Sequence, residues 1–138
     1  MVNTKFSVAI HILSLITYFP KNQLTSEFIA SSVNTNPVVV RRISSLLKKA
    51  GLIEVRAGIT GSTLTKEPAE ISLFDVYKAV QQQDSLFNIH EMPNLDCPVG
   101  GKIQSALDFT FVEVQKTMED ELKNRSLKDV INHFTPAK

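Results

Sequence analysis

The chain has little of several residue types that mark specialised proteins. Among 138 residues there is no tryptophan, and there are 5 glycines, 6 prolines and 1 cysteine, Cys97. A single cysteine excludes a disulfide within the chain. The low glycine and proline content and the 43% of apolar residues exclude collagen-like and disordered chains. The length fits one folded domain, or one small domain with an appendage.

The first apolar stretch is expected to be neither a membrane anchor nor an export signal. The first apolar stretch, FSVAIHILSLITYF at residues 6–19, is too short to span a bilayer and contains His11, Ser14 and Thr17. It ends at Pro20 without a small-residue cleavage pattern. We therefore expect a buried helix over residues 4–19, no membrane partner and a cytoplasmic location.

Motifs for catalysis are absent as well. No serine, cysteine or carboxylate has a partner at a diagnostic spacing, and no glycine-rich loop is suited to cradle a phosphate. His11 lies in the apolar helix and His133 near the end of the chain, where a structural or surface role is the simpler explanation. The sequence therefore predicts no enzyme, no catalytic residues and no metal site.

Acidic residues are scarce in the first half of the chain. Residues 1–66 contain eight lysines and arginines against two glutamates, a net charge of +6, whereas residues 67–138 carry seven against twelve, a net charge of −5. A basic half suits contact with a polyanion, although chance and solvated faces can also produce such an asymmetry.

Capping signals predict a helix-turn-helix in the basic half. Thr25 can cap a short second helix that has Glu27 in its first turn, and the polar turn NTN at residues 34–36 follows. Pro37 suits the first turn of a third helix, and Gly51 suits the position after its end.

The third helix has two different sides. Its apolar side is predicted to contain Val39, Ile43, Leu46, Leu47 and Ala50. Its other side is predicted to contain Val38, Arg41, Arg42, Ser45, Lys48 and Lys49. The second helix of a helix-turn-helix places its first residues against base edges in the major groove, and cations further along reach phosphates. Lys48 and Lys49 could instead serve the helix dipole, and a merely solvated face is the alternative for the whole stripe.

The remaining segments complete the predicted fold. LIEVR and STLT can form two strands around the turn AGITG, which is the wing of a winged helix, and Ser72 can cap a fourth helix. A loop at residues 84–97, a long helix from about Pro98 to near Asn124 and a short helix capped by Ser126 follow. The predicted fold class is mainly α: a winged helix-turn-helix domain with a two-stranded β wing over residues 1–82, then residues 83–138 with a long C-terminal dimerisation helix.

The long helix has a nearly coiled-coil spacing of apolar residues, here called the seam. The seam consists of Ile103, Leu107, Phe111, Val114, Met118 and Leu122. It could pack within the monomer, but its length of roughly 40 Å exceeds what a small winged domain can cover. We therefore predict a homodimer.

Two stretches invite comparison with a known family. They are SEFIASSVNTNPVVVRRISSLLKKAGLIEVRAGITG and, after it, EISLFDVYKAV. Both stretches resemble the Rrf-type family of bacterial winged-helix transcription regulators, and the likeness covers nearly the whole chain. The resemblance implies a homodimer that is joined through the long helix, binds a palindromic operator in double-stranded DNA and usually represses transcription. With Lys48 from the cationic stripe, the implied DNA contacts are Thr25, Ser26, Thr35, Asn36, Pro37, Val38, Val39, Arg41, Arg42, Arg56, Gly58, Thr60 and Ser62.

The sequence departs from the family in two places. Its wing lacks the usual pattern of glycines with an aromatic residue, and only Arg56 remains to enter the minor groove. Many members that sense iron–sulfur status, nitric oxide or iron place three cysteines in the loop and at the start of the long helix. This chain has only Cys97 within DCPVGG, and the expected positions of the others hold Ile89 or His90 and Ile103. Pairing of Cys97 with His90 would still leave too few ligands. We predict no cofactor and a partly buried Cys97, with a redox or ligand sensor as the alternative.

Two functions therefore remain open. The first is a sequence-specific DNA-binding repressor that responds to an unknown small-molecule or protein effector. The alternative is a winged-helix protein interaction module that regulates a partner enzyme, with the basic helix bound to an acidic protein surface.

Overall fold

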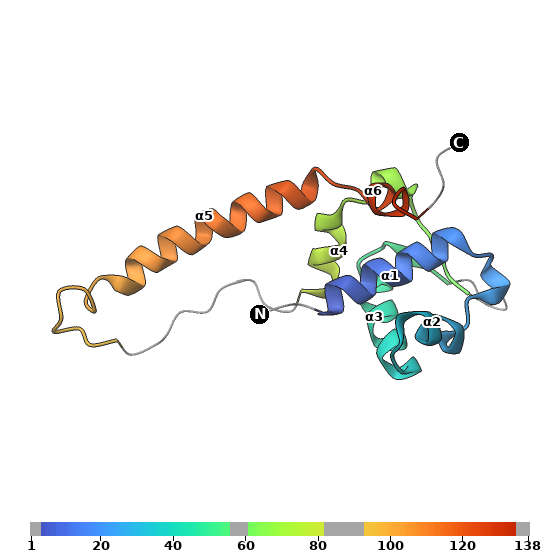
Figure 1. The fold of residues 1–138 in the computed structure, drawn as a ribbon, viewed down its shortest axis with the longest axis horizontal. Helices are drawn as coiled ribbons and strands as arrows, with labels where there is room; N and C mark the ends of the chain where they lie inside the picture. The colour runs from blue at the N-terminus through green and yellow to red at the C-terminus, as the bar shows by residue number, and fades with distance from the viewer. Residues whose placement is uncertain (1–3, 56–60, 82–92, 135–138) are drawn as a thin grey trace.

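The predicted architecture is confirmed by a computed structural model, which describes residues 4–55, 61–81 and 93–134. The described part is mainly helical, with one two-stranded antiparallel sheet. Figure 1 shows one long helix, α5, that projects from a body formed by the other helices.

Helix α1, Thr4–Tyr18, forms the centre of this body. Ala9, Ile12 and Leu13 are fully buried, and Leu15 nearly so. Ser14 is also buried, and its hydroxyl donates a hydrogen bond of 2.8 Å to the carbonyl of Ile10, so burial leaves no unpaired polar group there. The expectation of a buried first helix is confirmed.

The helix-turn-helix consists of α2, Ser26–Val33, and α3, Pro37–Lys49. Thr25 caps α2 by accepting the N–H of Phe28, and Asn36 caps α3 by accepting the N–H of Val39. Between them Asn34 adopts a left-handed conformation with φ of 65°, which ends α2 and turns the chain within three residues.

The buried side of α3 is shifted slightly from the predicted one. Val40, Ile43 and Leu47 are buried, whereas Val39 and Leu46 are half-buried. Ala50 was expected on the buried side and is exposed, because α3 ends at Lys49 and the chain turns at Gly51 with φ of 80°.

The turn after α3 brings Leu52 into the buried position instead. The N–H of Gly51 bonds the carbonyl of Lys48, and the N–H of Leu52 bonds the carbonyl of Leu47, both at 3.0 Å. This pair of bonds is the Schellman motif, in which the residue after the glycine packs against the last turn of the helix. Leu52 is 3% exposed, so it takes the place that the sequence pattern gave to Ala50.

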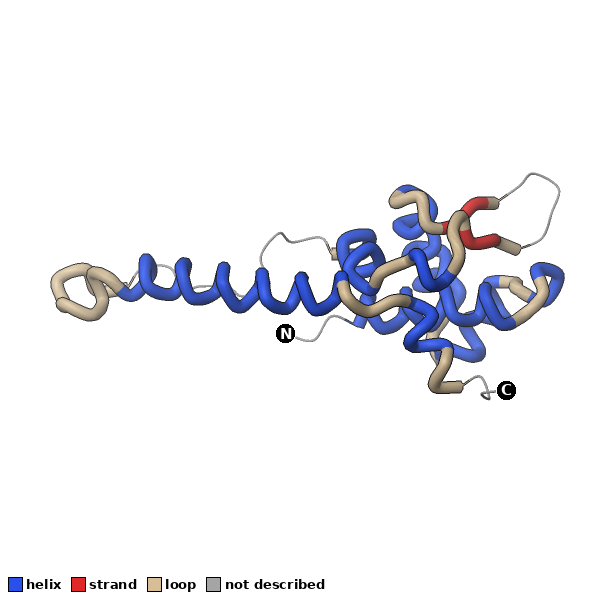
Figure 2. The backbone as a smooth tube through the Cα atoms, turned by 90° about the horizontal axis from the view of Figure 1, so that it is seen from above, coloured by secondary structure: helices blue, strands red, loops and turns tan. Residues whose placement is uncertain are grey.

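The wing is the hairpin of β1, Ile53–Glu54, and β2, Thr63–Leu64. The strands are antiparallel, with Ile53 opposite Leu64 and Glu54 opposite Thr63 (Figure 2, red). The 3-10 helix η1, Lys21–Gln23, connects α1 to α2, and η2, Pro68–Glu70, connects the wing to α4. Most of the predicted wing turn lies outside the described residues.

Helix α4, Leu73–Val80, begins with a capping box, as the sequence predicts for Ser72. The Ser72 hydroxyl accepts the N–H of Asp75, and the Asp75 carboxylate accepts the N–H of Ser72, both at 3.0 Å. Val76, Tyr77 and Val80 are buried on its inner side.

Helix α5, Ile103–Lys123, begins five residues later than the predicted start at Pro98. Residues 98–102 form turns that fold back onto residues 94 and 95. A Cβ atom at Gly100 would overlap the carbonyl oxygen of Asn94, and one at Gly101 would lie 2.9 Å from the carbonyl oxygen of Leu95. The two glycines allow a close backbone approach that helical periodicity does not reveal.

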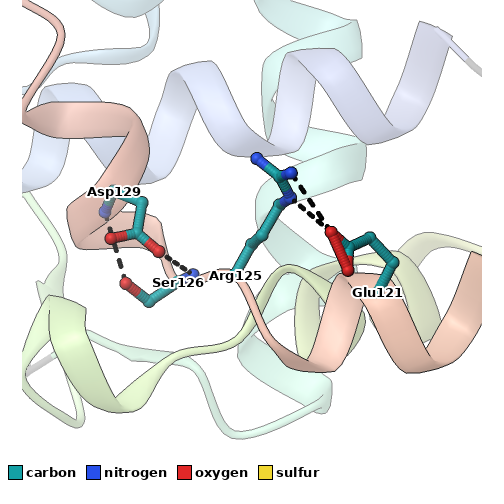
Figure 3. Close-up of polar contacts among 4 residues, drawn as sticks. All are labelled: Glu121, Arg125, Ser126 and Asp129. Atoms are coloured by element: carbon teal, nitrogen blue, oxygen red, sulfur yellow. Dashed lines mark hydrogen bonds and ion pairs between the residues drawn. The ribbon is translucent and has the colours of Figure 1, made fainter.

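The last helix, α6, Leu127–Ile131, returns to the core and fixes the end of α5. The N–H of Leu127 bonds the carbonyl of Ile71, and the N–H of Leu73 bonds the carbonyl of Arg125. Arg125 forms an ion pair with Glu121 at 3.1 Å, and Ser126 caps α6 together with Asp129; Figure 3 draws these contacts as dashed lines. The predicted division at residues 82 and 83 falls outside the described ranges and stays a prediction.

Candidate nucleic-acid interface

The outward side of α3 is cationic over its whole length. All six residues predicted for this side are exposed: Val38, Arg41, Arg42, Ser45, Lys48 and Lys49. Within the described ranges none of the four cations forms an ion pair with a carboxylate. The first turn of α3 carries no acidic residue, so the positive end of the helix dipole adds to these charges.

Two predicted DNA-contacting residues also shape the backbone. The hydroxyl oxygen of Thr25 and the Oδ1 atom of Asn36 each accept a backbone N–H at a helix start. Their oxygens therefore fix the residues at which α2 and α3 begin. Thr35 and Pro37 are half-exposed in the same turn, and Val38 is 54% exposed at the start of α3.

A hollow of about 360 Å³ lies between α2, α3 and the wing. Its polar lining includes Ser26 from α2, Arg41, Ser45 and Lys48 from α3, and Ser62 from the wing. These side chains come from segments up to 36 residues apart in the sequence, yet they surround one concave surface. Hydroxyls and cations in such a surface suit the phosphate oxygens of a nucleic acid.

Besides buried apolar residues, the lining of this hollow includes Ser44 and Val55, which were not predicted. Ser44 lies between the two sides of α3, and neither periodic stripe includes it. Val55, which follows β1, is 49% exposed. The alternation of side chains along a strand predicts on which face of the wing Val55 lies, but not which residue of another element lies beside it. Predicting Ser44 and Val55 would have required knowing how the wing strands are positioned relative to α3.

The tip of the wing cannot be compared with its prediction. Arg56, Gly58 and Thr60 lie outside the described residues. At the base of the wing Gly61 has φ of 90°, and a Cβ atom there would overlap the carbonyl oxygen of Lys21. The base of the wing therefore packs directly against η1, the segment that follows α1.

The seam lies along one side of α5. Five of its residues are half-buried, and Val114 is 46% exposed. No residue of α5 is buried, although the helix contacts α4 near its C-terminal end. Phe109 and Val112, which the heptad pattern did not select, are 72% and 65% exposed on the opposite side of α5.

Cys97 is exposed, so the expectation of a partly buried residue is wrong. It lies in the turns before α5, where the chain folds back on itself and leaves no core beside the thiol. Hydrogen bonds from the backbone N–H groups of Gly100 and Val99 lower the pKa of the Cys97 thiol. In the described part of the chain no three His, Cys, Asp or Glu side chains are grouped to hold a metal ion.

None of the helices in the described ranges has the length and apolar character needed to cross a bilayer. The three-helix core, the helix-turn-helix and the hairpin define a winged helix-turn-helix transcriptional regulator of a DNA-binding class. The chain belongs to the Rrf2 family, whose model, described as "Iron-dependent Transcriptional regulator", matches residues 2–133. The family resemblance and the prediction that the chain is not an enzyme are thereby confirmed.

Individual relatives agree with this assignment. The chain is 61% identical over 134 residues to the "Putative HTH-type transcriptional regulator YwnA" of Bacillus subtilis, covering 97% of this chain and 99% of that one. A solved structure described as "Crystal structure of a putative DNA binding protein" is 55% identical, with a TM-score of 0.75 over 93% of this chain and 99% of the other. CymR, the global cysteine regulator of B. subtilis, shares the fold at 18% identity, with a TM-score of 0.67 over 95% of each chain.

Proposed function

We propose that this regulator binds a palindromic operator as a homodimer, with one α3 helix in the major groove of each half-site, and represses transcription. The observation that carries the proposal is the hollow in which Ser26, Arg41, Lys48 and Ser62 meet beside the exposed side of α3. A surface of this shape and charge matches a phosphate backbone that borders a groove.

The two halves of α3 serve different contacts in this proposal. Val38, Arg41 and Arg42 lie in its first half and face base edges, where Arg can bond guanine and Val38 can touch a thymine methyl group. Lys48 and the hydroxyls of the hollow bond phosphates and hold the helix in register. At the base of the wing we expect Ser62 to bond the neighbouring backbone, while the predicted contacts of Arg56, Gly58 and Thr60 lie outside the described residues.

The seam of α5, which the rest of the chain buries only partly, supports the proposed dimer. Its 21 residues span about 32 Å, and none of them is buried by the rest of the chain. A second α5 against the seam would cover Leu107, Phe111 and their neighbours and give the pair twofold symmetry. Twofold symmetry places two copies of α3 against the same side of DNA, so half-sites about one helical turn apart are expected.

The donor set does not fit an iron–sulfur cluster. Cys97 is the one thiol of the chain, whereas such a cluster takes about four ligands, most of them cysteine. Ile103 occupies one of the places where a further cysteine would be expected, and residues 89 and 90 lie outside the described ranges. The proposal therefore includes no resident cluster, and anaerobically purified protein should contain no stoichiometric iron.

Selection of genomic fragments by the purified protein tests the function. The bound fragments should share a palindrome, and affinity should fall steeply as salt rises. The double variant Arg41→Ala/Arg42→Ala should lose preference for the palindrome. The slope of the logarithm of its binding constant against the logarithm of salt concentration should also be smaller in magnitude, by about 0.9 for each phosphate that the variant no longer neutralises.

The matched control is Lys116→Ala/Lys128→Ala, which removes two exposed cations from α5 and α6. This control should bind the palindrome with nearly wild-type affinity. If both double variants lose the same affinity, α3 does not read the sequence. If no fragment is enriched at low salt, the DNA-binding proposal fails.

A further inference from the structure

A cavity of about 520 Å³ lies between α1 and α6, away from the hollow beside α3. Its apolar wall includes Ile10 and Leu15 from α1 and Val130 from the end of α6. Among the described residues that line it, none is lysine, arginine, aspartate or glutamate. Its volume lies within the range of about 300–1,000 Å³ that is usual for small-molecule sites.

Two aromatic rings form the rim of the cavity. Tyr18 is 56% exposed and Phe134 is 46% exposed, and their ring centroids are 6.2 Å apart at an interplanar angle of 57°. Phe19 also lines the cavity and stacks edge-on against Tyr18 at 5.1 Å. Aromatic walls of this kind favour a flat apolar body of similar ring size.

One polar group in the lining is placed to bond a ligand. Nε2 of His11 lies 3.0 Å from the hydroxyl of Ser32, so it joins α1 to α2 of the helix-turn-helix. The hydroxyls of Ser7 and Ser14 already donate to backbone carbonyls of their own helix. Tyr18 also lines the cavity and carries a hydroxyl, but His11 is the lining residue whose bond to another helix a ligand could exchange.

We propose that this cavity binds an uncharged, flat, mainly apolar molecule of about two fused rings that carries one hydroxyl group. The rings lie between the aromatic rim and the aliphatic wall, and the hydroxyl bonds Nε2 of His11. Because this bond replaces the one to Ser32, the ligand loosens the attachment of α2 to α1. The effect on operator binding rests on the proposed function, whereas binding of the ligand does not.

Binding of 1-naphthol and of naphthalene to the full-length protein tests the site. The two probes share the ring system and differ in the hydroxyl group. We expect one probe per chain and about five-fold tighter binding of 1-naphthol, the usual scale for one hydrogen bond. His11→Phe should still bind naphthalene and lose the preference for 1-naphthol.

Further variants separate the site from general apolar binding. Tyr18→Ala should weaken both probes, whereas Phe109→Ala, which removes a similarly exposed aromatic ring from α5, should weaken neither. Ser32→Ala removes the competing hydroxyl from an exposed position and should increase the preference for 1-naphthol. Circular dichroism of each variant shows whether it is folded.

Three results would overturn the proposal. These are absence of saturable binding by the wild type, an unchanged preference in folded His11→Phe, and equal weakening by Phe109→Ala. If Tyr18→Ala instead weakens dimerisation while no probe binds, a second copy of the chain covers the cavity and the ligand site is wrong. Saturable binding without any change in operator affinity would confirm the site and refute its coupling to α2.

Discussion

Replacement of Leu107 by aspartate should separate the two protomers without unfolding the winged domain. Leu107 lies in the projecting half of α5, within the seam and away from the buried core. Burial of one leucine side chain stabilises by about 1.5–3 kcal/mol. Leu107 is already half-buried in the protomer, so an interface adds about half of that burial. A twofold interface contains the change twice, so the loss is about 1.5–3 kcal/mol before the cost of burying charge is added.

Since about 1.4 kcal/mol corresponds to a factor of ten, the dimer dissociation constant should rise by about 10- to 10²-fold, and the cost of burying charge adds to this. Sedimentation velocity over a range of protein concentrations measures this constant. Phe109→Asp is the matched control, because Phe109 is more exposed and lies on the opposite side of α5. The assignment of the seam as the dimer interface would be refuted by a Leu107→Asp protein that dimerises like the wild type, or by a Phe109→Asp protein that dissociates instead.

Three further predictions concern local structure. Cys97 should reach half-maximal alkylation at a lower pH in the folded protein than in urea, because backbone N–H groups stabilise its thiolate; equal values in the two states would contradict this. Gly61→Ala should lower the melting temperature more than Gly51→Ala, because both have positive φ but only Gly61 would also clash with the carbonyl of Lys21; equal shifts would contradict the wing anchor. Ser72→Ala should destabilise by about 1 kcal/mol in urea unfolding, since it removes the side-chain bond of the α4 cap, and an unchanged midpoint would contradict that role.

Local signals allowed most of the helix-turn-helix to be predicted from the sequence. A cap depends on residues three positions apart, so Thr25 and Ser72 could be assigned without any tertiary contact. Pro37 and Gly51 act through their own backbone angles, and the structure places both where the sequence predicts. The cationic side of α3 follows from helical periodicity alone.

Features that depend on distant segments could not be predicted in this way. The start of α5 is delayed because Gly100 approaches the carbonyl of Asn94, which no periodic pattern records. The exposure of Cys97 follows from the same turns. The cavity beside His11 exists because α6 returns to α1 across more than a hundred residues, and pairing with Ile71 guides that return. Contacts of this range require the assembled core.

In the folded chain, α3 and α5 are two elements with a large surface that does not pack against the core. The exposed cations of α3 suit DNA, and the seam of α5, which the protomer leaves half-buried or exposed, suits a second protomer. A pair of protomers presents two α3 helices at once, which makes binding to a palindrome tighter than binding to either half. Separation of the protomers should therefore also weaken operator binding.

Methylation interference at guanine N7 on a selected operator tests most directly whether α3 enters the major groove. The N7 atom lies in that groove, so methylation blocks a helix there and leaves a minor-groove contact unaffected. We expect interference in two patches about one helical turn apart, and loss of the pattern in Arg41→Ala/Arg42→Ala. Binding that tolerates N7 methylation throughout the protected site would contradict the placement of α3 in the major groove.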